Sequence, residues 1–163
     1  MQLLLKSGVG VTQFNKCKRY VIAIFTILAS LVASLSSFAG ALEAEAAFKA
    51  GNYEVAYKEW EEVAKTGDAT AEFNIGFLYS GGFGVPQDYS KAAEWWAKAA
   101  AQNLPVAELK LGLLYSWGKG VQQDDTEAAK LWLSSAAQGL SEAQQYIGYA
   151  YLVVNAPVDA HLL

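Results

Sequence analysis

Apolar residues recur at spacings of three and four along two neighbouring stretches of the chain, a spacing typical of amphipathic helices. The first stretch holds Ala71, Ile75, Leu78 and Tyr79, and the second holds Ala107, Leu111, Leu114 and Tyr115. Each is followed by an alanine-rich stretch with one tryptophan at the same place: Ala92, Ala93, Trp96 and Ala100, then Ala128, Ala129, Trp132 and Ala136. The pattern predicts two helix pairs, in which small residues let the helices approach and one indole fills each pair.

The two helix pairs are copies of one unit. Ala71–Val106 and Ala107–Glu142 align at an offset of 36 residues, and Ala143, Gly148 and Tyr151 begin a third copy. A period of this length is typical of stacked supersecondary units, which make interaction surfaces more often than active sites. The repeat therefore predicts an all-α fold, an α/α solenoid of stacked antiparallel helix pairs.

Capping residues mark the helix ends. Asp88 and Asp124 are expected to cap the second helices, and Ser141 with Gln144 predicts a capping box at the third unit. The left-handed conformation that follows many helices is expected where the second helices end, at Gly67, Asn103 and Gly139. Glycine also occurs inside each first helix, at Gly76, Gly112 and Gly148, which predicts another helix passing too close for a side chain.

The ends of the repeat array differ from its middle. Leu42–Lys65 predicts a helix pair with a short connection, and its Ala56 and Trp60 match the small residues and tryptophan of the later units. The third unit is expected to supply one helix, Ser141–Val154, and no second helix. An apolar cluster is left uncovered there, which predicts either a plug that folds back or self-association through this helix; its members are Tyr149, Leu152, Val153, Val154, Leu162 and Leu163.

The N-terminal segment resembles a secretory signal peptide. Lys6, Lys16, Lys18 and Arg19 precede an apolar core over residues 21–33, and small residues follow it. We expect removal of residues 1–40, with export to the periplasm or medium and no stable membrane association afterwards. The alternative is an uncleaved membrane anchor.

Removal of this segment changes the charge. The mature chain would keep 8 lysines against 16 acidic residues, a net charge of −8, with no arginine and no cysteine. Nucleic-acid binding is not expected, because it needs a basic surface.

The sequence offers little catalytic chemistry. The single histidine, His161, has no cysteine partner, so neither a metal site nor a cofactor is expected. Ser116 and Lys119 have the S-x-x-K spacing of serine enzymes acting on β-lactams, but no S-D-N or K-T-G partner motif occurs. Glu61-Glu62 and Asp124-Asp125 are neighbours on helices and point in different directions, so they are interpreted as solvated faces.

The motif of residues 71–103, with its loop S-G-G-F-G-V-P-Q-D and its run A-A-E-W-W-A-K-A-A, resembles the Sel1-like repeat, a relative of the tetratricopeptide repeat. The resemblance implies a tetratricopeptide-like capping pair at 41–68, repeats at 69–104 and 105–140, and a partial repeat at 141–163. It also implies a non-catalytic adaptor or scaffold that binds a protein or peptide, as in exported bacterial members; the alternative is a hydrolase acting on β-lactams or the cell wall. By the geometry of the family, the first helices line a concave groove, whose candidate binding residues are Phe73, Phe77, Leu109, Leu113, Trp117 and Tyr149.

Overall fold

The computed structural model describes residues 9–155. In this part the fold is all-α, a solenoid of helix pairs. The helices of this described part are α1 (Val9–Lys49), α2 (Tyr53–Ala64), α3 (Ala69–Gly81), α4 (Tyr89–Ala101), α5 (Pro105–Trp117), α6 (Asp125–Ala137), α7 (Ser141–Gln144) and α8 (Ile147–Asn155). The chain divides into two compact units, Met1–Ala39 and Gly40–Leu163. The predicted solenoid is confirmed in the second unit.

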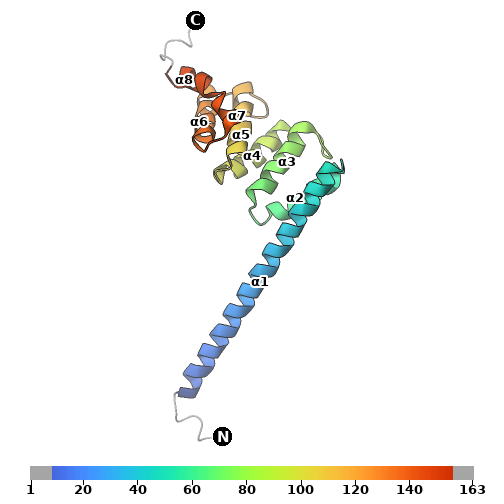
Figure 1. The fold of residues 1–163 in the computed structure, drawn as a ribbon, viewed down its shortest axis with the longest axis vertical. Coiled ribbons are helices and arrows are strands. Elements are labelled where there is room, and N and C mark those ends of the chain that lie inside the picture. The colour runs from blue at the N-terminus through green and yellow to red at the C-terminus, as the bar shows by residue number, and fades with distance from the viewer. Residues whose placement is uncertain (1–8, 156–163) are drawn as a thin grey trace. The chain divides into compact units, whose positions relative to one another are not determined.

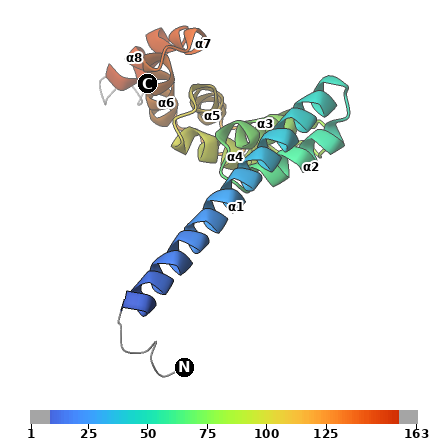
Figure 2. The same ribbon diagram turned by 60° about the horizontal axis from the view of Figure 1, so that its bottom comes forward.

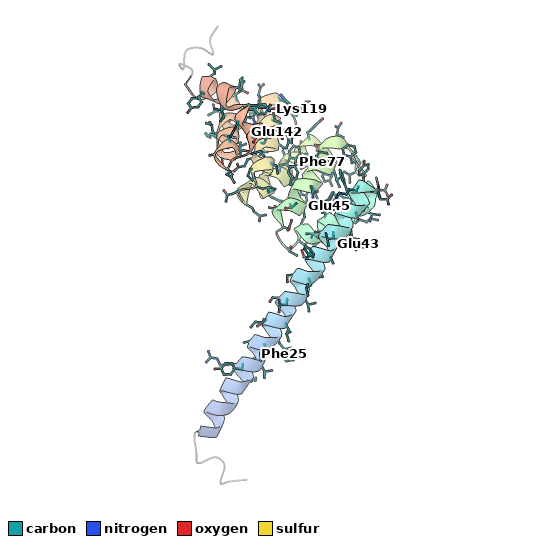
Figure 3. The ribbon with its side chains drawn as sticks, viewed as in Figure 1. Phe25, Glu43, Glu45, Phe77, Lys119 and Glu142 are labelled. Carbon is teal, nitrogen blue, oxygen red and sulfur yellow. The ribbon has the colours of Figure 1, made fainter. Side chains whose placement is uncertain are left out.

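The first unit consists, in its described residues, of the N-terminal part of α1. Its apolar side chains, such as Phe25 and Phe38, are exposed, and Figure 3 shows Phe25 projecting from the helix. Within the described residues, Lys18–Lys49 is long and apolar enough to cross a membrane. Signal sequences and membrane anchors share this property.

The second unit is a stack of antiparallel helix pairs. Figures 1 and 2 show α3 beside α4, followed along the stack by α5 beside α6. The C-terminal end of α1 pairs with α2, where the Phe48 ring lies 5.5 Å from that of Trp60. The stripes predicted from the sequence face the interior: Ala71, Ile75 and Leu78 are buried on α3, and Ala107, Leu111 and Leu114 on α5.

Most of the predicted helix ends are confirmed. The carboxylates of Asp88 and Asp124 accept hydrogen bonds from the backbone N–H groups of Lys91 and Glu127, at 3.0 and 2.9 Å. Gly67, Asn103 and Gly139 follow the second helices with φ values of 81°, 61° and 90°. The capping box predicted at Ser141 is wrong, because Leu140 occupies the cap position and makes no side-chain cap bond.

The single helix predicted for the third unit is interrupted. A turn at Gln145 and Tyr146 separates α7 from α8, and the Tyr146 N–H bonds to the Ala143 carbonyl three residues back. The Tyr146 ring stacks on the Trp132 ring at a centroid distance of 4.8 Å. This contact places Tyr146 against α6. The equivalent residue of the preceding unit, 36 positions earlier, is Lys110.

The glycines inside two of the first helices lie close to another helix, as predicted, and the approach is made by the tryptophan of that helix. A Cβ on Gly76 would lie 2.5 Å from Trp96 Cδ1, and one on Gly112 would lie 2.7 Å from Trp132 Nε1. Gly148 differs, since a Cβ there would meet nothing within 4 Å among the residues that the structure describes. The prediction of a close approach at Gly148 is therefore wrong.

Candidate protein-binding surface

The six predicted groove residues lie on three first helices, but they differ widely in exposure. Phe77 on α3, Trp117 at the end of α5 and Tyr149 on α8 are 37%, 57% and 44% exposed. Figure 3 labels Phe77 on this part of the stack. Phe73 and Leu113 are half-buried. Leu109 is fully buried, so its predicted place in a groove is wrong: its side chain belongs to the core shared with Trp132.

Phe77 belongs to a cluster of four aromatic side chains between the N-terminal helix pair and the first full repeat. Its ring lies 5.9 Å from that of Phe48 and 5.7 Å from that of Phe83, and both of these contact Tyr53, at 5.3 and 5.0 Å. The rings come from α1, α2, α3 and the loop after α3. Such pairs contribute about 0.5–1.5 kcal/mol each beyond their buried area. Phe77 therefore supports the fold as well as presenting an exposed surface.

Trp117 is the most exposed of the six and makes a charged contact. The ammonium group of Lys119 lies 4.9 Å from the centroid of the Trp117 ring and 5.4 Å from that of Tyr89. Cation–π attraction of this kind holds the lysine against the rings. The result is an amphipathic patch of two aromatic rings and one positive charge.

Tyr149 connects α8 to the preceding unit. Its ring lies 5.8 Å from that of Trp132 in an edge-to-face arrangement. Burial raises the pKa of the Tyr149 hydroxyl, and the neighbouring Asp125 carboxylate raises this pKa further. The contact with Trp132 therefore holds the partly exposed Tyr149 ring against α6.

The loops between the helices of a pair hold successive units in register. The second glycine of each loop lies against the first turn of the second helix of the preceding pair: Gly84 against α2 and Gly120 against α4. A Cβ on Gly84 would be 2.5 Å from the Tyr53 carbonyl carbon, and one on Gly120 would be within 2.5 Å of three backbone atoms of Tyr89 and Ser90. Ser90 Oγ also donates a hydrogen bond to the Gly120 carbonyl, at 2.9 Å. This docking fixes the spacing of the first helices, and so of the exposed aromatic residues.

The sequence interpretation missed a buried carboxylate in each full repeat. Glu72 is 7% exposed and accepts a bond from Gln102 Nε2 at 2.8 Å. Glu108 is 4% exposed and accepts bonds from Gln138 Nε2 at 2.8 Å and from Ser134 Oγ at 2.9 Å. Glutamate and glutamine recur at the same offset of 36, which is the signal that could have revealed the pair. The bonds tie the start of each first helix to the end of its second helix.

The described residues give no support to catalytic or metal chemistry at the positions considered. The Lys119 ammonium group lies over aromatic rings, and the Ser116 carbonyl accepts a bond from Gln123 Nε2 at 3.0 Å. Among the described residues, no three His, Cys, Asp or Glu side chains come together as a metal site. His161 lies outside the described residues.

A family model described as Sel1 repeat matches residues 69–104 and 105–140, the two full helix pairs. The chain contains two Sel1 repeats. A search of curated proteins found no match.

Solved structures agree with these Sel1 repeats. The chain is similar to a protective antigen of uropathogenic Escherichia coli with an SLR fold (34% identity, TM-score 0.62, 74% of this chain and 28% of the antigen). It is also similar to a Sel1 repeat protein from Oxalobacter formigenes (31% identity, TM-score 0.65, 71% of this chain and 46% of that protein). The cysteine-rich protein B of Helicobacter pylori shares the fold at 24% identity and a TM-score of 0.53, over 55% of this chain and 68% of that protein. The chain spans less than half the length of the first two proteins. Sel1 repeats are commonly protein-interaction modules.

Proposed function

We propose that this chain is a non-catalytic adaptor that binds another protein through the exposed aromatic residues of its first helices. These residues are Phe77, Trp117 and Tyr149, which we call the aromatic face. The observation that carries the proposal is that three successive first helices each expose a large aromatic side chain: Phe77 is 37%, Trp117 57% and Tyr149 44% exposed. Aromatic anchors of this kind dominate the energy of many protein interfaces.

The aromatic face is well suited to binding because its members are held in place before a partner arrives. Phe77 is supported by Phe48 and Phe83, Tyr149 by Trp132, and Trp117 by the charge of Lys119. Side chains ordered in advance lose less conformational entropy on binding. An extended or helical peptide that contacts several first helices would match this spacing.

The test is affinity capture from the compartment in which the protein resides. The bait is the wild-type chain, its Trp117→Ala variant, or the control variant Val55→Ala. Val55 is 48% exposed on α2, a second helix, and so lies outside the aromatic face. We expect one protein to be enriched by the wild type and by Val55→Ala, and its binding to weaken by about 1–4 kcal/mol for Trp117→Ala. Equal capture by all three baits would overturn the proposal.

We further propose that the protein acts after export, with about the first 40 residues as its signal peptide. The support is the apolar part of α1, which follows basic residues and precedes the small residues Ala39, Gly40 and Ala41. The first residue of the processed protein is expected to be Gly40 or Leu42. N-terminal sequencing of the protein from the exporting cell tests this, and a membrane-bound protein that starts at Met1 would show an anchor instead.

A further inference from the structure

The loop of the second full repeat has a lysine where the loop of the first has an aromatic ring. The Phe83 ring of the first loop lies 5.0 Å from the Tyr53 ring. At the same offset of 36 residues, the ammonium group of Lys119 lies 5.4 Å from the centroid of the Tyr89 ring. Both loops dock on the preceding second helix through their second glycine, so the exchange puts a positive charge where the first repeat has an apolar side chain.

Trp117 lies beside this lysine, and its counterpart in the first repeat is a glycine. Gly81 has no room for a side chain, because a Cβ there would meet the Phe83 ring. In the second repeat, the Lys119 ammonium group lies 4.9 Å from the centroid of the Trp117 ring, and Trp117 is 57% exposed. The charge is therefore flanked by two rings, one of which belongs to the aromatic face.

The charge of Lys119 has no counter-ion in the part of the chain that the structure describes. Lys119, labelled in Figure 3, is exposed, and no carboxylate of the described residues lies within 4 Å of its ammonium group. The acidic residues that follow the loop are engaged elsewhere: Asp124 accepts the N–H of Glu127 as a helix cap, and Asp125 neighbours Tyr149. Lysines that do have a carboxylate partner are Lys49, Lys65, Lys110 and Lys130.

The backbone around Lys119 is fixed on both sides. Gly118 ends α5 with a φ of 61°, and the N–H of Lys119 bonds to the Leu114 carbonyl at 3.1 Å. The Gly120 carbonyl accepts a bond from Ser90 Oγ at 2.9 Å. A side chain on an ordered backbone loses less conformational entropy when it binds.

We propose that Lys119 and Trp117 together bind an acidic side chain of the partner, an aspartate or glutamate next to an apolar residue in an extended segment. The carboxylate pairs with Lys119 Nζ, and the apolar neighbour packs on the exposed Trp117 ring. Because the chain as a whole has a formal net charge of −4, a local cation sets where an acidic segment lies and so fixes the partner's register. This inference rests on the proposed function and names the chemistry of its partner.

The probe is a library of random peptides displayed at the N-terminus of a phage coat protein, so that no peptide has a free C-terminal carboxylate. The bait is the full chain in detergent micelles, after removal of phage that bind empty micelles. We expect the selected sequences to carry Asp or Glu next to a large apolar residue. Binding of these peptides, synthesised with an amidated C-terminus, is then measured by fluorescence anisotropy. It should weaken about threefold to tenfold for Lys119→Gln and be retained by Lys119→Arg.

The matched control is Lys98→Gln, which changes the net charge equally. Lys98 lies 3.8 Å from the centroid of the Trp95 ring, but on α4, a second helix, so its loss should leave binding unchanged. The inference is overturned if no peptide is selected, if acidic residues are not enriched, or if Lys98→Gln weakens binding as much as Lys119→Gln.

The variant Trp117→Ala separates this inference from the proposed function. Peptides that are weakened by Trp117→Ala but bind Lys119→Gln as tightly as the wild type overturn the inference alone. Peptides that Trp117→Ala does not affect contradict the inference and the aromatic face together.

Discussion

One glycine and one tryptophan hold each complete helix pair together at close range. The indole of Trp96 lies on Gly76 and also donates a hydrogen bond from Nε1 to the Phe73 carbonyl, at 3.1 Å. A side chain at the glycine would compete directly with the ring. Gly148 is the matched control within the same chain, because no atom of the described residues lies within 4 Å of a Cβ placed there.

Replacing Gly76 by alanine is expected to destabilise the protein, whereas Gly148→Ala is not. Overpacking a close contact costs about 1–3 kcal/mol, and alanine recovers roughly 1 kcal/mol of helix propensity. Gly148→Ala gains the propensity without the clash, so its stability should equal or exceed that of the parent. Urea unfolding of both variants measures the difference, and equal midpoints would contradict the assignment of Gly76 as a packed position.

The half-buried Tyr57, which lies against the buried Tyr79, gives the protein a specific sensitivity to alkali. Tyr57 donates a hydrogen bond to Glu61 at 2.9 Å, and its oxygen lies 3.2 Å from the Tyr79 hydroxyl, which donates in turn. Burial raises the pKa of Tyr57, and the bonds to Tyr79 and Glu61 raise this pKa further. Above a pH of about 10, the unfolded chain therefore loses a proton that the folded chain retains.

The free energy of unfolding is expected to fall as the pH rises above about 10, the ordinary pKa of tyrosine. Below this pH both states keep the proton, so the contribution of Tyr57 is fully present there. Tyr57→Phe should reduce the slope of stability against pH in this range. Urea unfolding at several alkaline pH values measures the slope, and an unchanged slope for the variant would contradict the role of Tyr57.

At the scale of helices and loops, the second loop glycine sets the spacing between units. Gly120→Ala places a side chain against the backbone of Tyr89 at a φ of 73°, so strain and close contact add. We expect a cost of about 2–5 kcal/mol, the sum of a left-handed conformation and an overpacked contact.

The control is Gly139→Ala, which has a φ of 90° and nothing within 4 Å of the new side chain. It should cost only the conformational part, about 1–2 kcal/mol. Thermal unfolding of the two variants separates contact from conformation. If both lose the same stability, the loop does not dock as described.

The buried glutamates act at the same scale, since each joins the two helices of a pair. Glu108→Ala removes the acceptor for Gln138 and Ser134 and should cost about 1–3 kcal/mol. Glu142→Ala removes only a partly exposed ion pair with Lys110, which is worth about 0–1 kcal/mol. Chemical denaturation compares the two, and an equal loss would show that the bonds of Glu108 add nothing to stability.

At the scale of the whole molecule, the end of α1 caps the stack. Ala44 and Ala47 are buried, and the Phe48 ring contacts Tyr53, Trp60 and Phe77. A chain that starts at Gly40 keeps all these contacts, whereas one that starts at Asn52 loses them.

We expect the chain that starts at Gly40 to unfold cooperatively, and the chain that starts at Asn52 to be less stable. Loss of Phe48 alone removes a burial contribution on the order of 2 kcal/mol. Circular dichroism during thermal unfolding gives both midpoints. Equal midpoints would show that the helix pair at the start of the stack is not a cap.

The sequence by itself determined the repeat, the helix pairs and the caps. These features are local or periodic: Asp88 caps the helix beside it, and a spacing of three and four puts Ile75, Leu78 and Tyr79 on one helix face. The resemblance to the Sel1-like repeat, carried by the loop and alanine–tryptophan motifs, is confirmed by the matched residues and the related structures.

Only the tertiary structure decided which aromatic side chains remain exposed and which contacts the glycines make. Leu109 and Phe73 hold equivalent places one repeat apart on first helices, yet Leu109 is fully buried and Phe73 is half-buried. Gly148 occupies the same repeat position as Gly76, but among the described residues no atom lies within 4 Å of a Cβ placed there. Exposure and cavity filling depend on neighbours that are distant in sequence, so a repeat pattern predicts the position of a residue without fixing what covers it.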